Sequence, residues 1–381
     1  MNKFIEYRRE FHRYPELGWR EIRTSARIAE ILEEMGYTCL MGTDVIDVNT
    51  LSFEMLRDEE KKAEKERAIA QGAKPEYVER TGGYPGVIAE LDTGREGPVT
   101  ALRFDIDCLP YQEPKREGYR PFDEDYISCN EGFVHACGHD AHTAMGLGLA
   151  QALMERKDTL KGKIRIIFQP AEERYYGAQS IVDKGHLDDV INFISVHVAL
   201  TGDGYPLPSN TICCGCKDFV SDCQLDVTFK GRAAHPCGAS QEGKNALLAA
   251  CTAALNIHTI APHEAGLCRV NVGVLNAGVV VNTIAPNAFM SVEYRGQNKE
   301  ISEYARKRVF DVLDGASRSY DLEYSVNDFG EIPASQSDDA TYAGIGTDTT
   351  QPVHNPEFDI DEEAIPAAVD MLTHAVEELN M

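Results

Sequence analysis

The sequence of 381 residues contains no apolar run that approaches the roughly 18 residues expected of a membrane-spanning helix. It is also poor in basic residues, because 37 lysines and arginines stand against 62 aspartates and glutamates, for a formal net charge of −25. Such a charge repels nucleic-acid phosphates and disfavours an anionic membrane surface. We therefore expect neither a nucleic acid nor a membrane as a partner.

Two further features are missing. The N-terminal stretch MNKFIEYRREFHRYPE is charged and has no apolar segment of the kind found in secretory signal peptides. The eleven cysteines do not amount to a disulfide scaffold in a chain of this length, so we expect them to be thiols in a reducing compartment. These features predict a cytoplasmic protein.

Hydrophobic patterns divide the chain into two parts. Apolar strands such as 163–170 alternate with helices in the first part, which is typical of a mixed, mostly parallel sheet flanked by helices in an α/β fold. Between 223 and 328 the expected order becomes β-α-β-β-α-β, the ferredoxin-like arrangement. We predict a catalytic domain over 1–219 and 330–381, with a ferredoxin-like domain inserted over 220–329.

The stretch VHACGHDAHTAMG at 134–146 concentrates side chains that can bind metals. Three histidines, a cysteine and an aspartate occupy nine positions from Val134 to His142. The stretch alone fits either a metal site or a polar loop rich in histidine. Open α/β sheets place their sites at strand ends, so partners are expected there. The further candidates are Glu172 and Glu173 after the strand 163–170, His197 within the strand 193–200, and His354 in VHNPEFDIDEE.

Together these residues offer nitrogen, sulfur and oxygen ligands suited to Zn²⁺, Mn²⁺, Co²⁺ or Ni²⁺. The ligand set is Cys137, His139, Glu173, His197 and His354. Five protein ligands exceed what one catalytic ion takes and suit two ions about 3.5–4 Å apart. Glu172 neighbours a ligand but points elsewhere in an extended chain, so it is placed to act as general base on an activated water.

Six stretches of the chain together resemble the M20 metallopeptidase family, specifically its amidohydrolase branch. They are EFHRYPELGWREIRTS, HACGHDAHTA, IFQPAEE, AAHP, NTIAPNA and HNPEFDIDEE. The resemblance extends over nearly the whole chain and implies a zinc-exopeptidase-like catalytic domain. It also implies two metal ions bridged by Cys137 and water, with the other four ligands as above and Glu172 as the base.

The resemblance implies roles for further residues. The inserted domain would be a lid and dimerisation domain in which His235 reaches the active site of a partner subunit, and the assembly would be a homodimer or a heterodimer with a related subunit. Asn282 and Arg295 would hold the substrate carboxylate. The residues expected to support the ligands from behind are Asp105, Asp107, His135, Asp140 and His142.

The activity implied is metal-dependent hydrolysis of the amide bond in small N-acyl- or N-aroyl-amino acids, such as p-aminobenzoyl-glutamate, with two Mn²⁺ or Zn²⁺ ions per subunit. One alternative is a dipeptidase or carboxypeptidase on the same scaffold. Another is a weakly catalytic binding or regulatory subunit of a heteromeric hydrolase. The second alternative rests on 330–347, where the chain is shorter than the family pattern. A helix and a strand expected before His354 would be missing or reduced there.

Overall fold

The computed structural model describes residues 2–51, 56–174, 176–202, 205–215, 219–332, 340–349 and 351–381. The chain forms two compact units, Met1–Cys216 with Asp338–Met381, and Lys217–Ser337. Within the described ranges no helix is both long and apolar enough to span a membrane. The catalytic and lid roles assigned to the two parts of the chain stay predictions.

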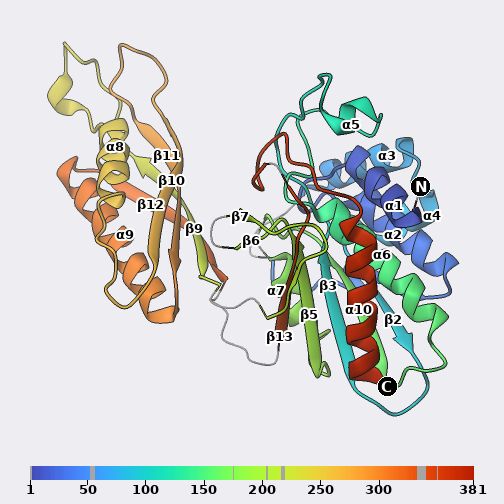
Figure 1. The fold of residues 1–381 in the computed structure, drawn as a ribbon. Helices are drawn as coiled ribbons and strands as arrows, with labels where there is room; N and C mark the ends of the chain where they lie inside the picture. The colour runs from blue at the N-terminus through green and yellow to red at the C-terminus, as the bar shows by residue number, and fades with distance from the viewer. Residues whose placement is uncertain are drawn as a thin grey trace. The chain divides into compact units, whose positions relative to one another are not determined.

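The first unit is built on a seven-stranded sheet in the order β1-β2-β4-β3-β5-β13-β8 (Figure 1). Its four central strands run parallel: β4 (Lys163–Gln169), β3 (Val99–Asp105), β5 (Asn192–Val198) and β13 (Ala340–Ile345). The outer strands are antiparallel to their neighbours: β1 (Thr38–Met41), β2 (Val87–Asp92) and β8 (Ile212–Cys213). The predicted mixed α/β fold is confirmed, with the parallel pairs gathered at its centre.

Helix α6 (His139–Glu155) lies at the centre of the first unit. It is buried on nearly all sides, because its sequence is apolar almost all round after the first turn. Helices α1 (Lys3–Arg13) and α10 (Ala364–Asn380) pack against it, as does β3. Helix α1 buries Arg8 and His12 along with its apolar side chains, which is unusual for charged residues and indicates buried partners.

The remaining elements of the first unit lie around this core. They are α2 (Ile22–Glu34), η1 (Gly42–Asp44), α3 (Asp58–Ala70), α4 (Pro75–Arg80), α5 (Arg120–Asp123), α7 (Gly177–Asp183), β6 (Thr201–Gly202) and β7 (Tyr205–Pro206). The charged stretch 57–67, expected as a solvated helix, is most of α3, in which only Ala68 is buried.

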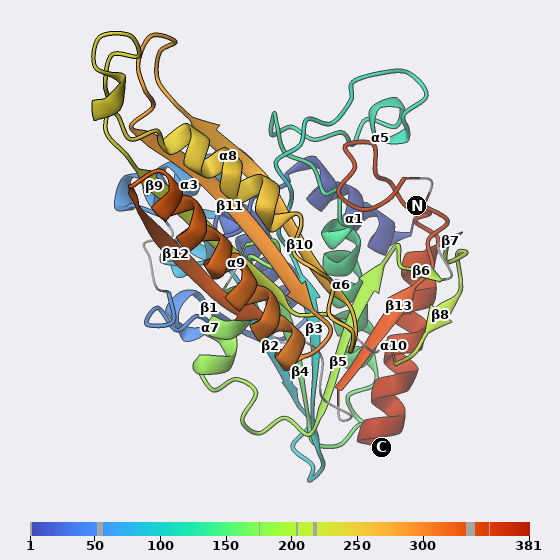
Figure 2. The ribbon, with the colours of Figure 1, turned by 90° about the vertical axis from the view of Figure 1, so that its left-hand side faces the viewer.

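The second unit has the order β9 (Asp222–Lys230), η2 (Ser240–Glu242), α8 (Ala246–Ile257), β10 (Cys268–Ala277), β11 (Asn287–Gly296), α9 (Lys299–Ser319) and β12 (Glu323–Ile332). Its strands form an antiparallel sheet in the order β10-β11-β9-β12. Figure 2 shows α8 and α9 side by side on one face of this sheet. The predicted β-α-β-β-α-β order is therefore confirmed.

The segment before His354 differs from expectation in two ways. A short connection was expected near 328–332, but β12 continues through this stretch, with an irregular register between Asp328 and Glu331, so that expectation was wrong. A strand does precede His354: β13 pairs in parallel with β5 and sets Gly344 opposite His197. The helix expected between the two strands would have to lie in 333–339, outside the described residues.

Candidate metal centre

A tight turn leads into helix α6 and positions Cys137 and His139. Gly138 adopts a left-handed conformation with φ of 84°, and His139 is the first residue of the helix. A Cβ atom at position 138 would lie 2.3 Å from a methyl carbon of Val198. The turn therefore requires glycine, and it brings both side chains against the end of β5, where His197 precedes Val198.

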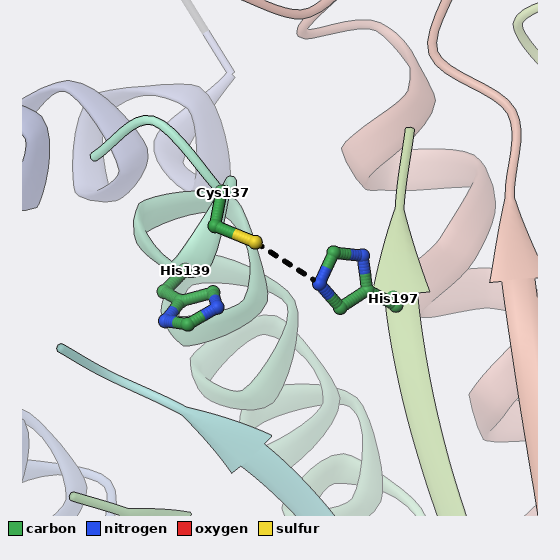
Figure 3. Close-up of side chains that lie close together, drawn as sticks. All are labelled: Cys137, His139 and His197. Carbon is green, nitrogen blue, oxygen red and sulfur yellow. Dashed lines mark hydrogen bonds between the residues drawn. The ribbon is translucent and has the colours of Figure 1, made fainter. Parts of the chain in front are cut away.

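The five expected ligands lie together as two groups that share Cys137. The ligand atoms of Cys137, His139 and His197 all lie within 4.8 Å of one another, and so do those of Cys137, Glu173 and His354. Figure 3 shows the thiol of Cys137 directed at the His197 ring, with Sγ 3.4 Å from Nε2. His354 Nε2 lies 3.2 Å from Glu173 Oε1. The thiol thus stands between two sets of donors, as a bridging ligand must.

Hydrogen bonds on the far side of the ligands leave their near atoms available. His139 donates from Nδ1 to Asp107 Oδ1 at 3.1 Å, and His197 donates from Nδ1 to the carbonyl oxygen of Val198 at 2.6 Å. Among the described residues, His139 Nε2 and Glu173 Oε1 are buried without a hydrogen-bond partner. Unpartnered buried polar atoms are costly, and a divalent cation would satisfy both. These residues fit a metal ion.

Asp107 connects two of the expected ligands. Its Oδ1 accepts from His139, and its Oδ2 accepts the backbone N–H of Glu173 at 2.9 Å. One carboxylate therefore sets both the orientation of the imidazole and the path of the loop that follows β4. Such support from behind the ligands is common in metal sites.

His142 lies beside the expected ligands, but both of its ring nitrogens are occupied. Nδ1 lies 2.5 Å from Asp105 Oδ1, and Nε2 accepts the backbone N–H of Val198 at 2.9 Å. Because Nε2 accepts, the ring is neutral, and burial lowers the pKa of His142 to about 4. His142 holds the end of β5 in place, and it has no nitrogen left for a metal even though it clusters with Asp105 and His139.

Asp105 provides the charge in this layer. Burial alone would raise the pKa of its carboxyl, but the charge of Arg103, 2.7 Å away, and those of nearby histidines hold it well below the usual range. Asp105 Oδ1 also lies 3.6 Å from His139 Nε2. A permanent carboxylate therefore lies behind the two histidines of α6.

Asp140 and His135 do not hydrogen-bond any of the expected ligands within the described ranges. Asp140 Oδ2 accepts from Arg8 Nε and from His12 Nδ1, each at 2.8 Å. His135 is buried with both ring nitrogens unpartnered among the described residues, and burial lowers its pKa to about 3. Their expected support of the metal ligands stays a prediction.

Glu172 lies next to this cluster. Its Oε2 is 3.9 Å from His139 Nε2, and its side chain is 38% exposed, so water can reach the carboxylate. Burial among protein atoms raises the pKa of Glu172 to about 7, against the opposing charge of His139. Its position beside the expected ligands, with water access, is what a general base requires.

The other expected site residues belong to the second unit. His235 is exposed after β9, and its Nδ1 accepts the backbone N–H groups of Cys237 and Gly238, which places the ring proton on Nε2. Asn282 is exposed in the loop between β10 and β11. Arg295 lies on β11, 2.6 Å from Glu293 and 3.5 Å from Asp222.

Sequence reasoning assigned no role to a charged network behind the metal candidates. Arg8 and His12 on α1 bind Asp140, and Arg8 also binds Asp359 and Glu362. Both ends of this network lie in motifs quoted for the family resemblance, EFHRYPELG and HNPEFDIDEE. The signal was the acidic run after His354, which has no apolar periodicity of its own.

A sheet with a parallel centre, clustered Cys, His and Glu side chains near its strand ends, and an inserted ferredoxin-like unit together define the two-domain architecture of zinc-exopeptidase-type hydrolases. Residues 101–378 match the Peptidase family M20/M25/M40. The chain belongs to this family, as the sequence motifs predicted.

Named relatives cover almost the entire chain. It is 38% identical to indole-3-acetyl-aspartic acid hydrolase of Enterobacter agglomerans and to a p-aminobenzoyl-glutamate hydrolase subunit of Escherichia coli (strain K12), each over 97% of this chain and 94% of the relative. The charged insertion at 51–82 and NVGVLNAG had indicated a resemblance to this hydrolase, which is confirmed. Both alignments span 417 positions, more than the 381 residues of the chain, so the relatives carry residues that this chain lacks.

Solved structures support the same family. The aminobenzoyl-glutamate utilization protein from Klebsiella pneumoniae matches with a TM-score of 0.80 at 33% identity, covering 98% of this chain and 96% of that one. A Bacillus subtilis protein named as a dinuclear metal binding peptidase from the M20 family matches with a TM-score of 0.65 at 26% identity, covering 99% and 98%.

Proposed function

We propose that this chain is a metal-dependent amidohydrolase that cleaves the amide bond of N-acyl- or N-aroyl-amino acids. The observation that carries the proposal is the pair of donor groups that share Cys137, with Glu172 beside them. The relatives are named as hydrolases of indole-3-acetyl-aspartic acid and p-aminobenzoyl-glutamate, and as a deacetylase of N-acetyldiaminopimelate. Each of these compounds is an acyl or aroyl group joined through an amide to an amino acid.

Two divalent ions suit the donors. One would be held by Cys137, His139 and His197, and the other by Cys137, Glu173 and His354. The mixture of sulfur, nitrogen and oxygen donors favours Mn²⁺ or Zn²⁺, with Co²⁺ and Ni²⁺ also compatible. When bound, such ions polarise a carbonyl group and lower the pKa of water.

The side chains around the cluster then have separate tasks. Glu172 accepts the proton of the attacking water and delivers it to the leaving amine, because its carboxylate is close to the donors and still open to solvent. Asp107 keeps His139 and Glu173 in place. Asp105 and His142 keep the end of β5 in place. Only Glu172 among them exchanges a proton with the substrate.

The second unit would supply specificity and the contact with a partner. We infer that His235 serves the active site of a second subunit and that Asn282 and Arg295 hold the substrate carboxylate. The partner is either a second copy or a related chain, and one relative is itself named as a hydrolase subunit. Strand β10 forms one edge of its sheet and exposes Val274 and Leu275, which suits pairing with another edge.

A dipeptidase or carboxypeptidase remains the second candidate, because the family is one of peptidases. A substrate panel distinguishes the two. The purified chain would be stripped with a chelator, reloaded with Mn²⁺, Zn²⁺ or Co²⁺, and assayed on p-aminobenzoyl-glutamate, N-acetyl-amino acids and free dipeptides. Faster hydrolysis of the acylated compounds supports the proposal. Faster hydrolysis of dipeptides would replace it, and no hydrolysis with any metal would favour a binding subunit.

A further inference from the structure

His354 stands on a segment that the preceding chain does little to fix. Its side chain is 48% exposed, and its backbone has the left-handed φ of 64°. Its N–H donates to the carbonyl oxygen of Ala136, next to Cys137, at 2.7 Å. This single backbone contact joins the His354 segment to the turn before α6, so the rest of the segment needs another anchor.

That anchor is the guanidinium group of Arg8, which is fully buried. Its Nε donates to Asp140 Oδ2 at 2.8 Å, in the first turn of α6 beside His139. Its Nη2 donates to Asp359 Oδ1 at 2.7 Å and its Nη1 to Glu362 Oε1 at 3.0 Å, both beyond His354. One side chain therefore connects the two segments that carry the expected ligands.

The charges around Arg8 form a balanced network. The cations are Arg8, Arg9, His12 and Arg120, and the anions are Glu113, Asp140, Asp359 and Glu362. His12 lies between two carboxylates, 2.8 Å from each. Removing one member of a buried network leaves its partners with uncompensated charge, which is strongly destabilising for the local arrangement.

The two ends of the network depend on Arg8 to different degrees. Asp140 retains His12 when Arg8 is lost, and its helix is buried in the core of the first unit. Asp359 retains only Arg120 among the cations that contact it, and that arginine is itself 34% exposed. Loss of Arg8 should therefore loosen the His354 segment while Cys137 and His139 stay in place.

We propose that Arg8 is a positioning residue of the metal centre: it fixes 354–362 against α6 and so sets the affinity for the ion bound by Cys137, Glu173 and His354. The inference rests on the proposed function, because it assumes the metal centre. It assigns a role in metal binding to the N-terminal helix, which contributes no ligand of its own. It also explains how His354 can be held in place despite the short connection before β13.

The test compares metal binding by Arg8→Met, Arg8→Lys and the wild-type chain. Each protein would be stripped of metal and titrated with Mn²⁺ or Zn²⁺ by calorimetry, with the melting temperature recorded in parallel. Arg165→Met is the matched control, because Arg165 is also a buried arginine bound to two carboxylates, Glu90 and Asp189, at 2.6 and 2.7 Å. His354→Ala marks the ion that remains when this ligand is removed.

In Arg8→Met we expect one ion to bind about ten- to a hundredfold more weakly, the usual effect of losing a group behind the ligands. The remaining ion should match the one retained by His354→Ala. Arg8→Lys should recover part of the loss, and Arg165→Met should bind both ions as the wild type does. If Arg8→Met does not fold, Asp359→Asn tests the same link on the outer side of the network.

Equal weakening of both ions, or unchanged affinities in a folded Arg8 or Asp359 variant, would overturn the positioning role and leave the proposed function standing. A wild-type chain that binds no metal and hydrolyses no acylated amino acid would instead remove the proposed function, and the positioning role with it.

Discussion

The thiol of Cys137 lies 3.4 Å from Nε2 of His197, across the boundary between the turn before α6 and the end of β5. The contact is specific because Nδ1 of His197 is committed to the carbonyl oxygen of Val198, which leaves Nε2 to face the sulfur. Two segments separated by 60 positions in sequence thus present a soft donor and an imidazole to the same point.

The first prediction follows from this pair. Cys137→Ser should lower the content of both ions, because Cys137 belongs to both donor groups, whereas His197→Ala should affect only one. Elemental analysis of the reloaded proteins measures the stoichiometry. Wild-type stoichiometry in both variants would show that the ligand set is wrong.

The second prediction concerns the base. Glu172→Gln keeps the shape of the side chain and removes the proton acceptor, so turnover should fall by roughly a hundredfold or more at near-normal metal content. Steady-state kinetics on an N-acyl-amino acid, with metal analysis of the same sample, measures both. Activity close to wild type would assign the proton transfer to another group.

The third prediction tests the turn before α6. Gly138→Ala would force an alanine into the left-handed region and place its Cβ 2.3 Å from Val198. Gly72→Ala is the control, since Gly72 has φ of 91° but nothing within 4 Å of the added carbon. The control should lose about 1–2 kcal/mol of unfolding free energy from the backbone conformation alone. Gly138→Ala should lose about 1–3 kcal/mol more, measured by urea unfolding, and equal losses would contradict the close contact.

The elements that the sequence predicted well are those with continuous local patterns. The run KIRIIFQ is apolar throughout and is buried as β4, and the tendency of sites to lie at strand ends was enough to group Glu172, Glu173 and His197. Strand β13 was not predicted, because ATYAGI is short and follows a stretch without periodicity. The Arg8 network was missed for a different reason: its partners lie 132 to 354 positions away along the chain, and no local pattern encodes such pairings.

The fourth prediction is a pH dependence of stability. His12 is fully buried, and although burial opposes its charge, Glu113 and Asp140 raise its pKa from 6.5 to about 9. Because the folded-state pKa lies above the unfolded one, the stabilisation is fully present below pH 6.5 and is lost as the pH rises through about 9. A shift of this size corresponds to roughly 3 kcal/mol.

Urea unfolding of the wild type and of His12→Asn, at pH 6.5 and at pH 9.5, isolates this contribution, because other titrating groups act equally in both proteins. The wild type should lose roughly 3 kcal/mol more than the variant between the two values. A parallel decline in the two proteins would mean that His12 is neutral in the folded state.

The fifth prediction concerns His235. Its ring is exposed after β9, and two backbone N–H groups fix the tautomer that leaves a proton on Nε2, so it can donate to an oxyanion. We expect His235→Ala to lower turnover strongly without loss of metal, because the residue belongs to neither donor group. Kinetic assays of the metal-loaded variant measure this, and unchanged turnover would leave His235 as an ordinary surface residue.

Whether His235 acts on its own chain or on a partner is decided by mixing two inactive variants, His235→Ala and Glu172→Gln. If His235 serves the partner's site, a dimer with one copy of each variant has one site with both defects and one site with neither. With random exchange about half of the dimers are mixed, so about a quarter of all sites should recover, provided that the chain pairs with itself. If His235 acts within its own chain, every site in a mixed dimer keeps one defect and no activity returns. Exchange between dimers must be shown independently with differently tagged chains, because absence of recovery contradicts action across the interface only when mixed dimers are present.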